Sequence, residues 1–408
     1  MDKKRMIAAA AVAVAAFTIF TAGGTSPQTA IDIAQQTAFL AAGIKLPENK
    51  EALTALQIKS SDEAAPQETE DPPQEHEQPS DKPEDTGAVD IATTPATVEL
   101  PVITAPDTDG AAPEASARVI SQNITEFDDE LDYTAEGVKS GIIYRKHYSG
   151  YQGEEYIILP GGGLVWNCTS DSPEALAQAA EELPELNIEL NSEEPQVLIV
   201  HTHTTESYEP YQRSYYDSSF PFRTRDPSHN MVRVGEALAQ RLAEHGISVL
   251  HDGTVHDYPA YSGAYDRSEA TIRAALEQYP SIRVIIDLHR DAIANPDGSR
   301  TAPVAEINGK SAAQFMIIAG CDDGRFGNMP EYMENFRLAC LIQSSAEALY
   351  PGLARPILFD YRNYNQHIST GSLLIEIGSH ANSLDEAVYS AELLGDSIAK
   401  ALEQLAAE

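Results

Sequence analysis

Short apolar runs alternate with amphipathic helical segments through the C-terminal half of the chain, and this alternation restricts the fold more than any other feature. Runs of the kind that forms buried strands lie at 197–200, 247–250, 283–288, 315–319 and 372–377. Segments with helical periodicity lie between or after them, at 231–245, 266–278, 335–349 and 384–405. Strands that alternate with helices build a sheet with helices on both faces. The sequence therefore predicts an α/β fold, a three-layer sandwich with a mostly parallel central sheet.

The N-terminus has the pattern of an export segment. Lys3, Lys4 and Arg5 precede an uncharged, mostly apolar run at 6–22. Basic residues on the short side of such a run keep that side in the cytoplasm. We expect residues 1–24 to form a cytoplasmic basic tip and a single-pass membrane anchor, with the remainder outside the cytoplasm. A cleaved signal peptide is the alternative.

Four further segments follow the anchor. Residues 25–58 form a short segment with helical character, and residues 59–117 are acidic, rich in proline and free of aromatic residues. A stretch of this composition cannot bury enough apolar surface to offset its ordering entropy, so it predicts a disordered linker. Strand signals at 141–145 and 156–159 place residues 118–195 in the N-terminal part of the globular region. Residues 196–408 form the domain that carries the polar clusters described next.

Charge and cysteine content exclude two classes of function. The formal net charge of the chain is -36, whereas a nucleic-acid-binding protein needs a basic surface, so no nucleic-acid partner is expected. The three cysteines form no C-x-x-C pair, which excludes a zinc site built from paired thiolates.

Ionisable side chains follow or end three of the apolar runs. They are His201, His203 and Glu206 after the first run, Asp287, His289, Arg290 and Asp291 in and after the second, and Glu376 in the third. The carboxyl ends of parallel strands meet at one edge of a sheet, where ligands bind. Burying such groups is costly unless they are paired or bind a metal ion. The three clusters therefore predict one shared site.

The residue types favour a catalytic zinc ion. His203 and Glu206 form an H-x-x-E pair, and His289 supplies a distant third ligand. Three nitrogen and oxygen ligands with one open position are typical of catalytic zinc. Such a hydrolase also uses a carboxylate that does not bind the metal, and Glu376 suits this role because apolar surroundings raise the pKa of a carboxyl group.

Several assignments stay open at this point. A single histidine at a strand end is more often hydrogen-bonded within the core than bound to metal, so the zinc prediction depends on the combination. His201 is the alternative to His203 as a ligand. Asp287 and Asp291 are candidates for holding His289 in orientation from behind the metal. Arg290 either binds a substrate carboxylate or pairs with one of these aspartates.

Four segments resemble the stage II sporulation protein P family. They are VLIVHTHTTESY at 197–208, NMVRVGEALAQRLAEHG at 230–246, IDLHRDA at 286–292 and LIEIG at 374–378. The resemblance covers about residues 120–408 and implies a fold similar to that of zinc-dependent N-acetylmuramoyl-L-alanine amidases. It also implies that His203, Glu206 and His289 bind zinc and that Glu376 is the catalytic acid and base. Residues 196–408 would then be a catalytic zinc amidase domain.

The same resemblance implies a role in forespore engulfment during sporulation. Family members are described as cell-wall amidases that free the stem peptide from the glycan of peptidoglycan, and as endopeptidases that cut peptide cross-links. Their partners are a lytic transglycosylase, stage II sporulation protein D, and a membrane protein, stage II sporulation protein M. Two alternatives are a zinc peptidase on stem peptides and a non-catalytic cell-wall scaffold.

Overall fold

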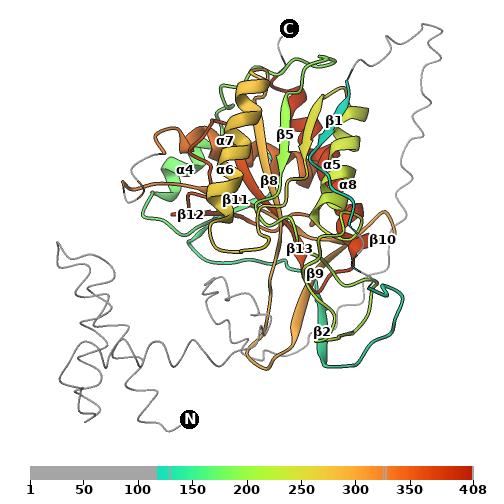
Figure 1. The fold of residues 1–408 in the computed structure, drawn as a ribbon. Helices are drawn as coiled ribbons and strands as arrows, with labels where there is room; N and C mark the ends of the chain where they lie inside the picture. The colour runs from blue at the N-terminus through green and yellow to red at the C-terminus, as the bar shows by residue number, and fades with distance from the viewer. Residues whose placement is uncertain (1–116, 128, 130, 325, 327–328, 407–408) are drawn as a thin grey trace, which may run out of the picture. The chain divides into compact units, whose positions relative to one another are not determined.

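The computed structural model describes residues 117–406, apart from residues 128, 130, 325, 327 and 328 (Figure 1). The predicted anchor at 1–24, the segment at 25–58 and the predicted linker as far as residue 116 lie outside the described residues. In the part of the chain that is described, no helix combines the length and the apolar character needed to cross a membrane.

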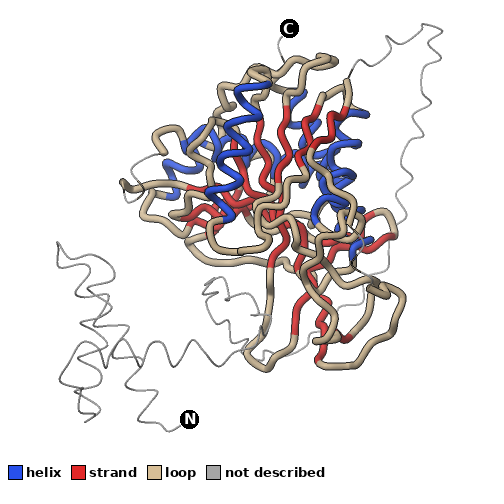
Figure 2. Tube along the Cα trace, viewed as in Figure 1, coloured by secondary structure: helices blue, strands red, loops and turns tan. Residues whose placement is uncertain are grey.

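A large sheet contains strands β1 (Val119–Gln122), β3 (Tyr156–Ile158), β4 (Leu164–Asn167), β5 (Val197–Val200), β7 (Val249–Asp252), β8 (Val284–Asp291), β11 (Phe315–Gly320), β12 (Ile357–Asp360) and β13 (Ser372–Ser379). Their order is β1-β7-β5-β8-β13-β11-β12-β4-β3. Figure 1 labels several of these strands, and Figure 2 shows strands in red between helices in blue. Neighbouring strands run parallel except for β11 against β13 and β3 against β4. The predicted α/β fold with a mostly parallel central sheet is confirmed. Strands from 118–195 and from 196–408 join this one sheet.

The helices are α4 (Pro173–Ala179), α5 (Met231–Glu244), α6 (Ala264–Gln278), α7 (Tyr332–Leu349) and α8 (Leu384–Glu403). Two of the longer ones begin at side-chain caps, because Asn230 accepts a hydrogen bond from the Val232 N–H and Ser383 forms a capping box with Glu386. Such caps satisfy backbone N–H groups that the helix itself leaves without partners.

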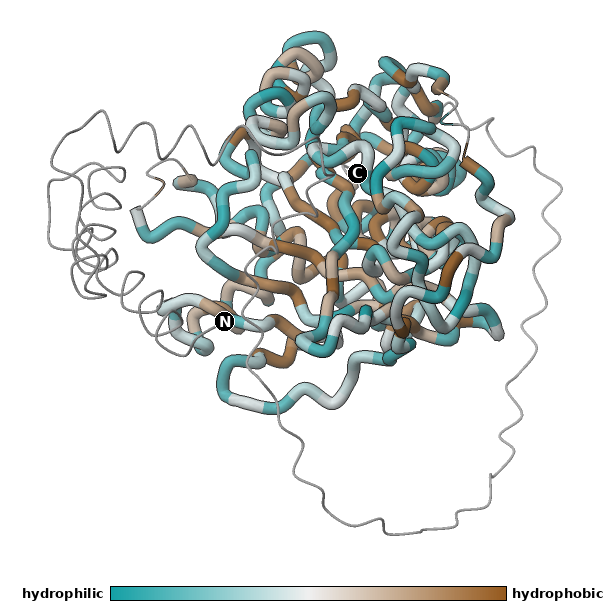
Figure 3. The backbone as a smooth tube through the Cα atoms, turned by 60° about the horizontal axis from the view of Figure 1, so that its bottom comes forward, coloured by the Kyte–Doolittle hydropathy of each residue, from teal (hydrophilic) through white to brown (hydrophobic). Residues whose placement is uncertain are grey.

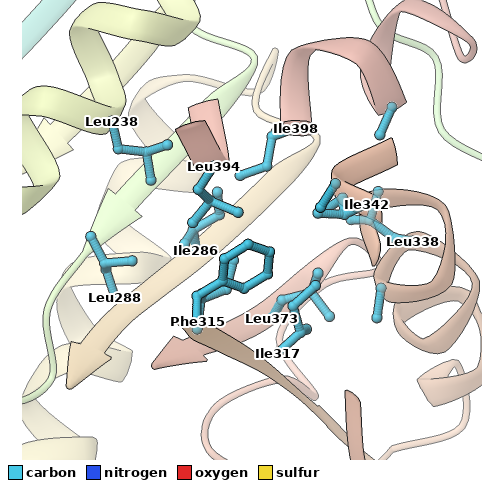
Figure 4. Close-up of a cluster of buried hydrophobic side chains, with 14 of the residues drawn as sticks. Leu238, Ile286, Leu288, Phe315, Ile317, Leu338, Ile342, Leu373, Leu394 and Ile398 are labelled. Atoms are coloured by element: carbon cyan, nitrogen blue, oxygen red, sulfur yellow. The ribbon is translucent and has the colours of Figure 1, made fainter. Parts of the chain in front are cut away.

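Alternation along each buried strand sends side chains to opposite faces of the sheet. In β5, Val197 and Ile199 pack in the main core with α5, α7 and α8, whereas Leu198 and Val200 pack with α6. Figure 4 shows part of the main core, where Phe315 and Ile286 lie against Leu394. Apolar segments gather in the middle of the described part, with hydrophilic segments around them (Figure 3). Helices therefore cover both faces of the large sheet, and α6 defines the face that matters for the site.

Two features differ from the sequence-based expectation. A second sheet, in the order β10-β9-β2-β6, is formed by β2 (Gly141–Lys146), β6 (Tyr215–Tyr216), β9 (Arg300–Ile307) and β10 (Lys310–Ala313), of which only β2 was expected. Strands β8 and β13 are also longer than predicted, because their pairing continues past the apolar runs. His289 therefore lies inside β8 rather than beyond its end, and Glu376 lies inside β13, as the run at 372–377 predicted.

Candidate active site

The predicted site residues lie at the carboxyl ends of β5, β8 and β13, three strands that are neighbours in the sheet. His289 on β8 and Glu376 on β13 are direct register partners. Because Ile285 packs with α6, the alternation of β8 puts Asp287 and His289 on that same face. The backbone ladder thus fixes a histidine and a carboxylate side by side over one face of the sheet.

A tight turn after β5 brings two more site residues to this face. The Glu206 N–H donates to the His203 carbonyl at 3.1 Å, which closes the H-x-x-E turn. Thr202 fixes the turn to β8, since its N–H and its hydroxyl donate to the Asp287 carboxylate at 2.8 and 2.6 Å. The turn therefore holds His203 and Glu206 beside His289.

Glu206 lies beside His289 in the site. Oε2 of Glu206 lies 3.6 Å from Nδ1 of His289 and accepts a hydrogen bond from the Arg290 N–H at 3.2 Å. Burial raises the pKa of Glu206, but the charges of Arg290, His289 and Arg223 outweigh burial and hold it well below its usual range. The Glu206 carboxylate is therefore ionised although only 3% of the residue is exposed.

Asp287 contacts the opposite edge of the His289 ring. Its Oδ1 lies 2.9 Å from Nε2 of His289. This contact is an ion pair and does not meet the geometry of a hydrogen bond. Burial lowers the pKa of His289, but Asp287 and Glu206 raise it well above its usual value. The two carboxylates therefore stabilise positive charge at this ring.

His203 is buried among aromatic rings. It stacks on Tyr261 with ring centroids 4.4 Å apart, and its edge meets Tyr265 and His289 at 5.6 and 5.2 Å. Its Nδ1 has no hydrogen-bond partner among the described residues. Burial lowers the pKa of His203 to about 3, so the ring is neutral and has a lone pair available.

Glu376 is buried beside His289, and its Oε2 has no hydrogen-bond partner among the residues that the structure describes. Burial raises the pKa of Glu376 to about 8, with a further contribution from the negative charge of Asp291. A carboxyl group with such a pKa gives and takes a proton near neutral pH.

His201 lies on the other face of the sheet. Its Nδ1 is 3.0 Å from the Leu288 carbonyl oxygen, and its Nε2 is 3.0 Å from Nε2 of His251. Both ring nitrogens therefore have partners, and Gly235 of α5 approaches the same ring. This geometry favours His203 over His201 as a ligand.

Arg290 and Asp291 have partners other than those expected. The Arg290 guanidinium donates to the Ser207 carbonyl at 2.9 Å and to the Phe222 carbonyl at 3.0 Å, so it ties down the loop between them. Asp291 accepts from Arg355 at 2.9 Å. Asp287, and not Asp291, is thus the aspartate beside His289, and Arg290 is held by backbone carbonyls.

The donor atoms of His203, Glu206 and His289 are of the types that bind zinc. In a tetrahedral site, two ligand atoms that are each about 2.0–2.1 Å from zinc lie about 3.3 Å from each other. Oε2 of Glu206 and Nδ1 of His289 are 3.6 Å apart, which is close to this separation. The bare Nδ1 of His203 supplies a third donor of the right type. Within the described residues, however, no group of three or more such side chains is already arranged to hold a metal ion. The donor set fits zinc in type and in the spacing of one pair.

Arg223, Asp257, Tyr261 and Tyr265 also contact the site, and none of them was expected. Arg223 donates to Asp257 at 2.6 Å and lies 3.4 Å from Glu206. These residues come from loops and from the start of α6, where no periodic signal distinguishes a site residue from ordinary surface.

The chain matches a family model described as stage II sporulation protein P over residues 48–399. It is 30% identical over 211 residues to "Stage II sporulation protein P" of Bacillus subtilis (strain 168), a match that covers 49% of each chain. The chain thus spans about half the length of the curated relative it matches.

Solved structures similar to the chain include an N-acetylmuramoyl-L-alanine amidase from Clostridium difficile 630, with a TM-score of 0.32, 13% identity and coverage of 52% of this chain and 96% of that one. Another is the amidase AmiC2 of Nostoc punctiforme, with a TM-score of 0.30, 12% identity and coverage of 51% and 95%. The family match extends over most of the chain, including every site residue described above. The chain therefore belongs to the stage II sporulation protein P family.

Proposed function

We propose that this chain is a zinc-dependent peptidoglycan hydrolase, an N-acetylmuramoyl-L-alanine amidase that acts in forespore engulfment. The observation that carries the proposal is the convergence of His203, Glu206, His289 and Glu376 on one buried patch. Nδ1 of His203 and Oε2 of Glu376 have neither a hydrogen bond nor an ion pair to a described residue. Membership of the family supports the role in sporulation.

His203, Glu206 and His289 would hold the zinc ion. When bound, zinc polarises the substrate carbonyl and lowers the pKa of a water molecule. Asp287 keeps the His289 ring in orientation from its far edge, and the ring of Tyr261 covers His203. Arg290 ties the 207–222 loop to β8 through the Ser207 and Phe222 carbonyls. The protein thus supplies ligands that neighbouring side chains hold in place.

Glu376 would move the proton that amide hydrolysis requires. It accepts a proton from the attacking water, whose oxygen bonds to the carbonyl carbon, and passes that proton to the departing amine nitrogen as the C–N bond breaks. Its pKa of about 8 suits both steps near neutral pH. Its position beside His289 puts it within reach of the same reacting groups.

The proposal extends to the setting of the enzyme. Residues 1–24 would anchor it in the cell membrane with the catalytic domain outside the cytoplasm, and it would work with stage II sporulation proteins D and M. The basic flank and apolar run at the N-terminus support the anchor, and the family resemblance supports the partners. Endopeptidase activity on peptide cross-links would accompany the amidase activity.

The experiment incubates the 408-residue chain with purified peptidoglycan, with zinc or with a chelator, and identifies the products by mass spectrometry. The expected products are intact stem peptides and peptide-free glycan, formed only with zinc and lost in Glu376→Gln. Shortened peptides on intact glycan would instead identify a peptidase. No cleavage by a chain that binds zinc would favour a scaffold.

A further inference from the structure

Two half-buried arginines and two exposed tyrosines form a rim beside the candidate active site. The Arg223 guanidinium lies 4.9 Å over the ring of Tyr261, and the Arg225 guanidinium lies 4.3 Å over the ring of Tyr258. Thr224, between the two arginines, is buried and donates to Asp129. We call Arg223, Arg225, Tyr258 and Tyr261 the Arg–Tyr rim.

The loop that carries the two tyrosines is held rigidly although it is exposed. Tyr258 and Tyr261 are 51% and 38% exposed, so their rings are available to contact a ligand. Arg267 of α6 donates to the backbone carbonyls of His256, Ala260 and Ser262, so one side chain fixes the loop at three points. An exposed but fixed surface loses little entropy when it binds a ligand.

The rim is continuous with the proposed metal ligands. Tyr261 stacks on His203 at 4.4 Å, and Arg223 lies 3.4 Å from Oε1 of Glu206. Arg223 also donates to Asp257, whose carboxylate in turn accepts from the Thr205 hydroxyl at 2.6 Å. A molecule that contacts Arg223 and Tyr261 therefore lies next to the proposed metal ligands.

Arg225 differs from Arg223 in its charge environment. Its guanidinium lies between two rings, 3.8 Å over Phe127 and 4.3 Å over Tyr258, and it has no carboxylate partner among the described residues. A positive charge without an ion pair to any described residue is notable in a chain whose formal net charge is -36. A guanidinium that is stacked between two rings keeps the N–H groups along its edge free of those rings. These N–H groups can donate two parallel hydrogen bonds to one carboxylate.

We propose that the Arg–Tyr rim is the subsite for the peptide side of the substrate, and that Arg225 binds a carboxylate of that peptide so that the scissile amide lies over His203, Glu206, His289 and Glu376. This inference rests on the proposed amidase function, which it deepens by naming a residue that decides substrate specificity. The tyrosine faces pack against the peptide, and the guanidinium selects acidic peptides over neutral ones.

The test measures binding and cleavage separately. Binding of the 408-residue chain to insoluble peptidoglycan is measured by sedimentation in a Glu376→Gln background, where cleavage is absent. Arg225→Gln is expected to weaken binding about ten-fold, because a charged hydrogen-bond donor is lost. Arg273→Gln is the matched control, since it removes one exposed arginine from α6 away from the rim. In the cleaving enzyme, Arg225→Gln is expected to raise KM about ten-fold and to change kcat less than about three-fold.

Peptidoglycan whose peptide carboxylates have been converted to amides supplies the second arm. On this substrate the wild-type chain should bind as weakly as Arg225→Gln, and the variant should lose nothing further. Arg225→Lys should recover part of the binding, because it keeps the charge but not the planar fork. Equal binding by Arg225→Gln and Arg273→Gln, or an Arg225 effect that persists on amidated substrate, would overturn the inference. Failure of the amidase proposal is recognised separately, as absent cleavage by the wild-type chain.

Discussion

Glu376 lies directly across the β8–β13 ladder from His289, as its register partner in two parallel strands. Hydrogen bonds of the central sheet, and not a loop, therefore set the separation between the proposed general base and a proposed zinc ligand. The register shifts just after Glu376, where Gly378 has a φ of +61°, a conformation that side chains rarely adopt. A site built on central strands is more rigid than one built on loops.

Glu376→Gln is expected to abolish hydrolysis and leave zinc binding intact. The substitution keeps the shape of the side chain but removes the proton transfer, a loss of about 100-fold or more in kcat. The rate of amide release and the zinc content of the same preparation provide the check. Full activity in the variant would assign the proton transfer to another residue.

Zinc content distinguishes His203 from His201. His203→Ala and His289→Ala are expected to weaken zinc binding at least about ten-fold, because each removes a donor from the α6 face. His201→Ala is the matched control, because its ring faces α5 and both ring nitrogens have partners. It should lose about 1–3 kcal/mol of stability yet bind zinc at the wild-type stoichiometry. Metal analysis after dialysis provides the measurement, and the reverse pattern would make His201 the ligand.

The apolar runs predicted the central sheet because each run contains enough branched side chains to be buried on both faces. They did not predict where β8 and β13 end, since the pairing continues through ionisable residues that the site keeps buried. His201 could have been placed from sequence. A strand that continues from 197–200 puts residue 201 on the face of Val197 and Ile199, opposite to that of His289.

The second sheet also left a signal in the sequence. Asn308 and Gly309, both with positive φ, form the two-residue turn between β9 and β10, and an Asn-Gly pair between alternating segments is a strong hairpin signal. The Arg–Tyr rim left no such signal. Arg223 and Tyr261 are far apart in the sequence and come into contact only in the folded chain.

Gly235→Ala is expected to destabilise the protein although alanine is the better helix former. A Cβ at position 235 would lie 2.6 Å from Nε2 of His251 and 2.7 Å from Nε2 of His201. These rings are buried and hydrogen-bonded to each other, so they cannot move aside. Overpacking of about 1–3 kcal/mol should exceed the helix propensity gain of about 1 kcal/mol. Urea unfolding tests this, with the exposed Glu236→Ala on the same helix as control, and a gain in stability would contradict it.

Glu386→Gln is expected to lower stability at neutral pH and to lose its effect in acid. Glu386 forms an ion pair with Arg145 of β2 and accepts from Ser311 of β10 at 2.7 Å, so it joins the second sheet to α8. Burial raises the pKa of Glu386, but Arg145 and Ser311 outweigh it and lower the pKa below the ordinary value of 4.5.

The direction of the pH dependence follows from that lowered pKa. A carboxyl group with a depressed folded-state pKa contributes its stability above its unfolded pKa and loses it as pH falls through the folded value. Glu386→Gln should therefore be about 1–3 kcal/mol less stable than wild type at pH 7, and the difference should shrink below about pH 4. Urea unfolding across this range, beside the exposed Glu392→Gln on the same helix, measures it. A difference that stays constant in acid would mean that Glu386 acts through its shape and not its charge.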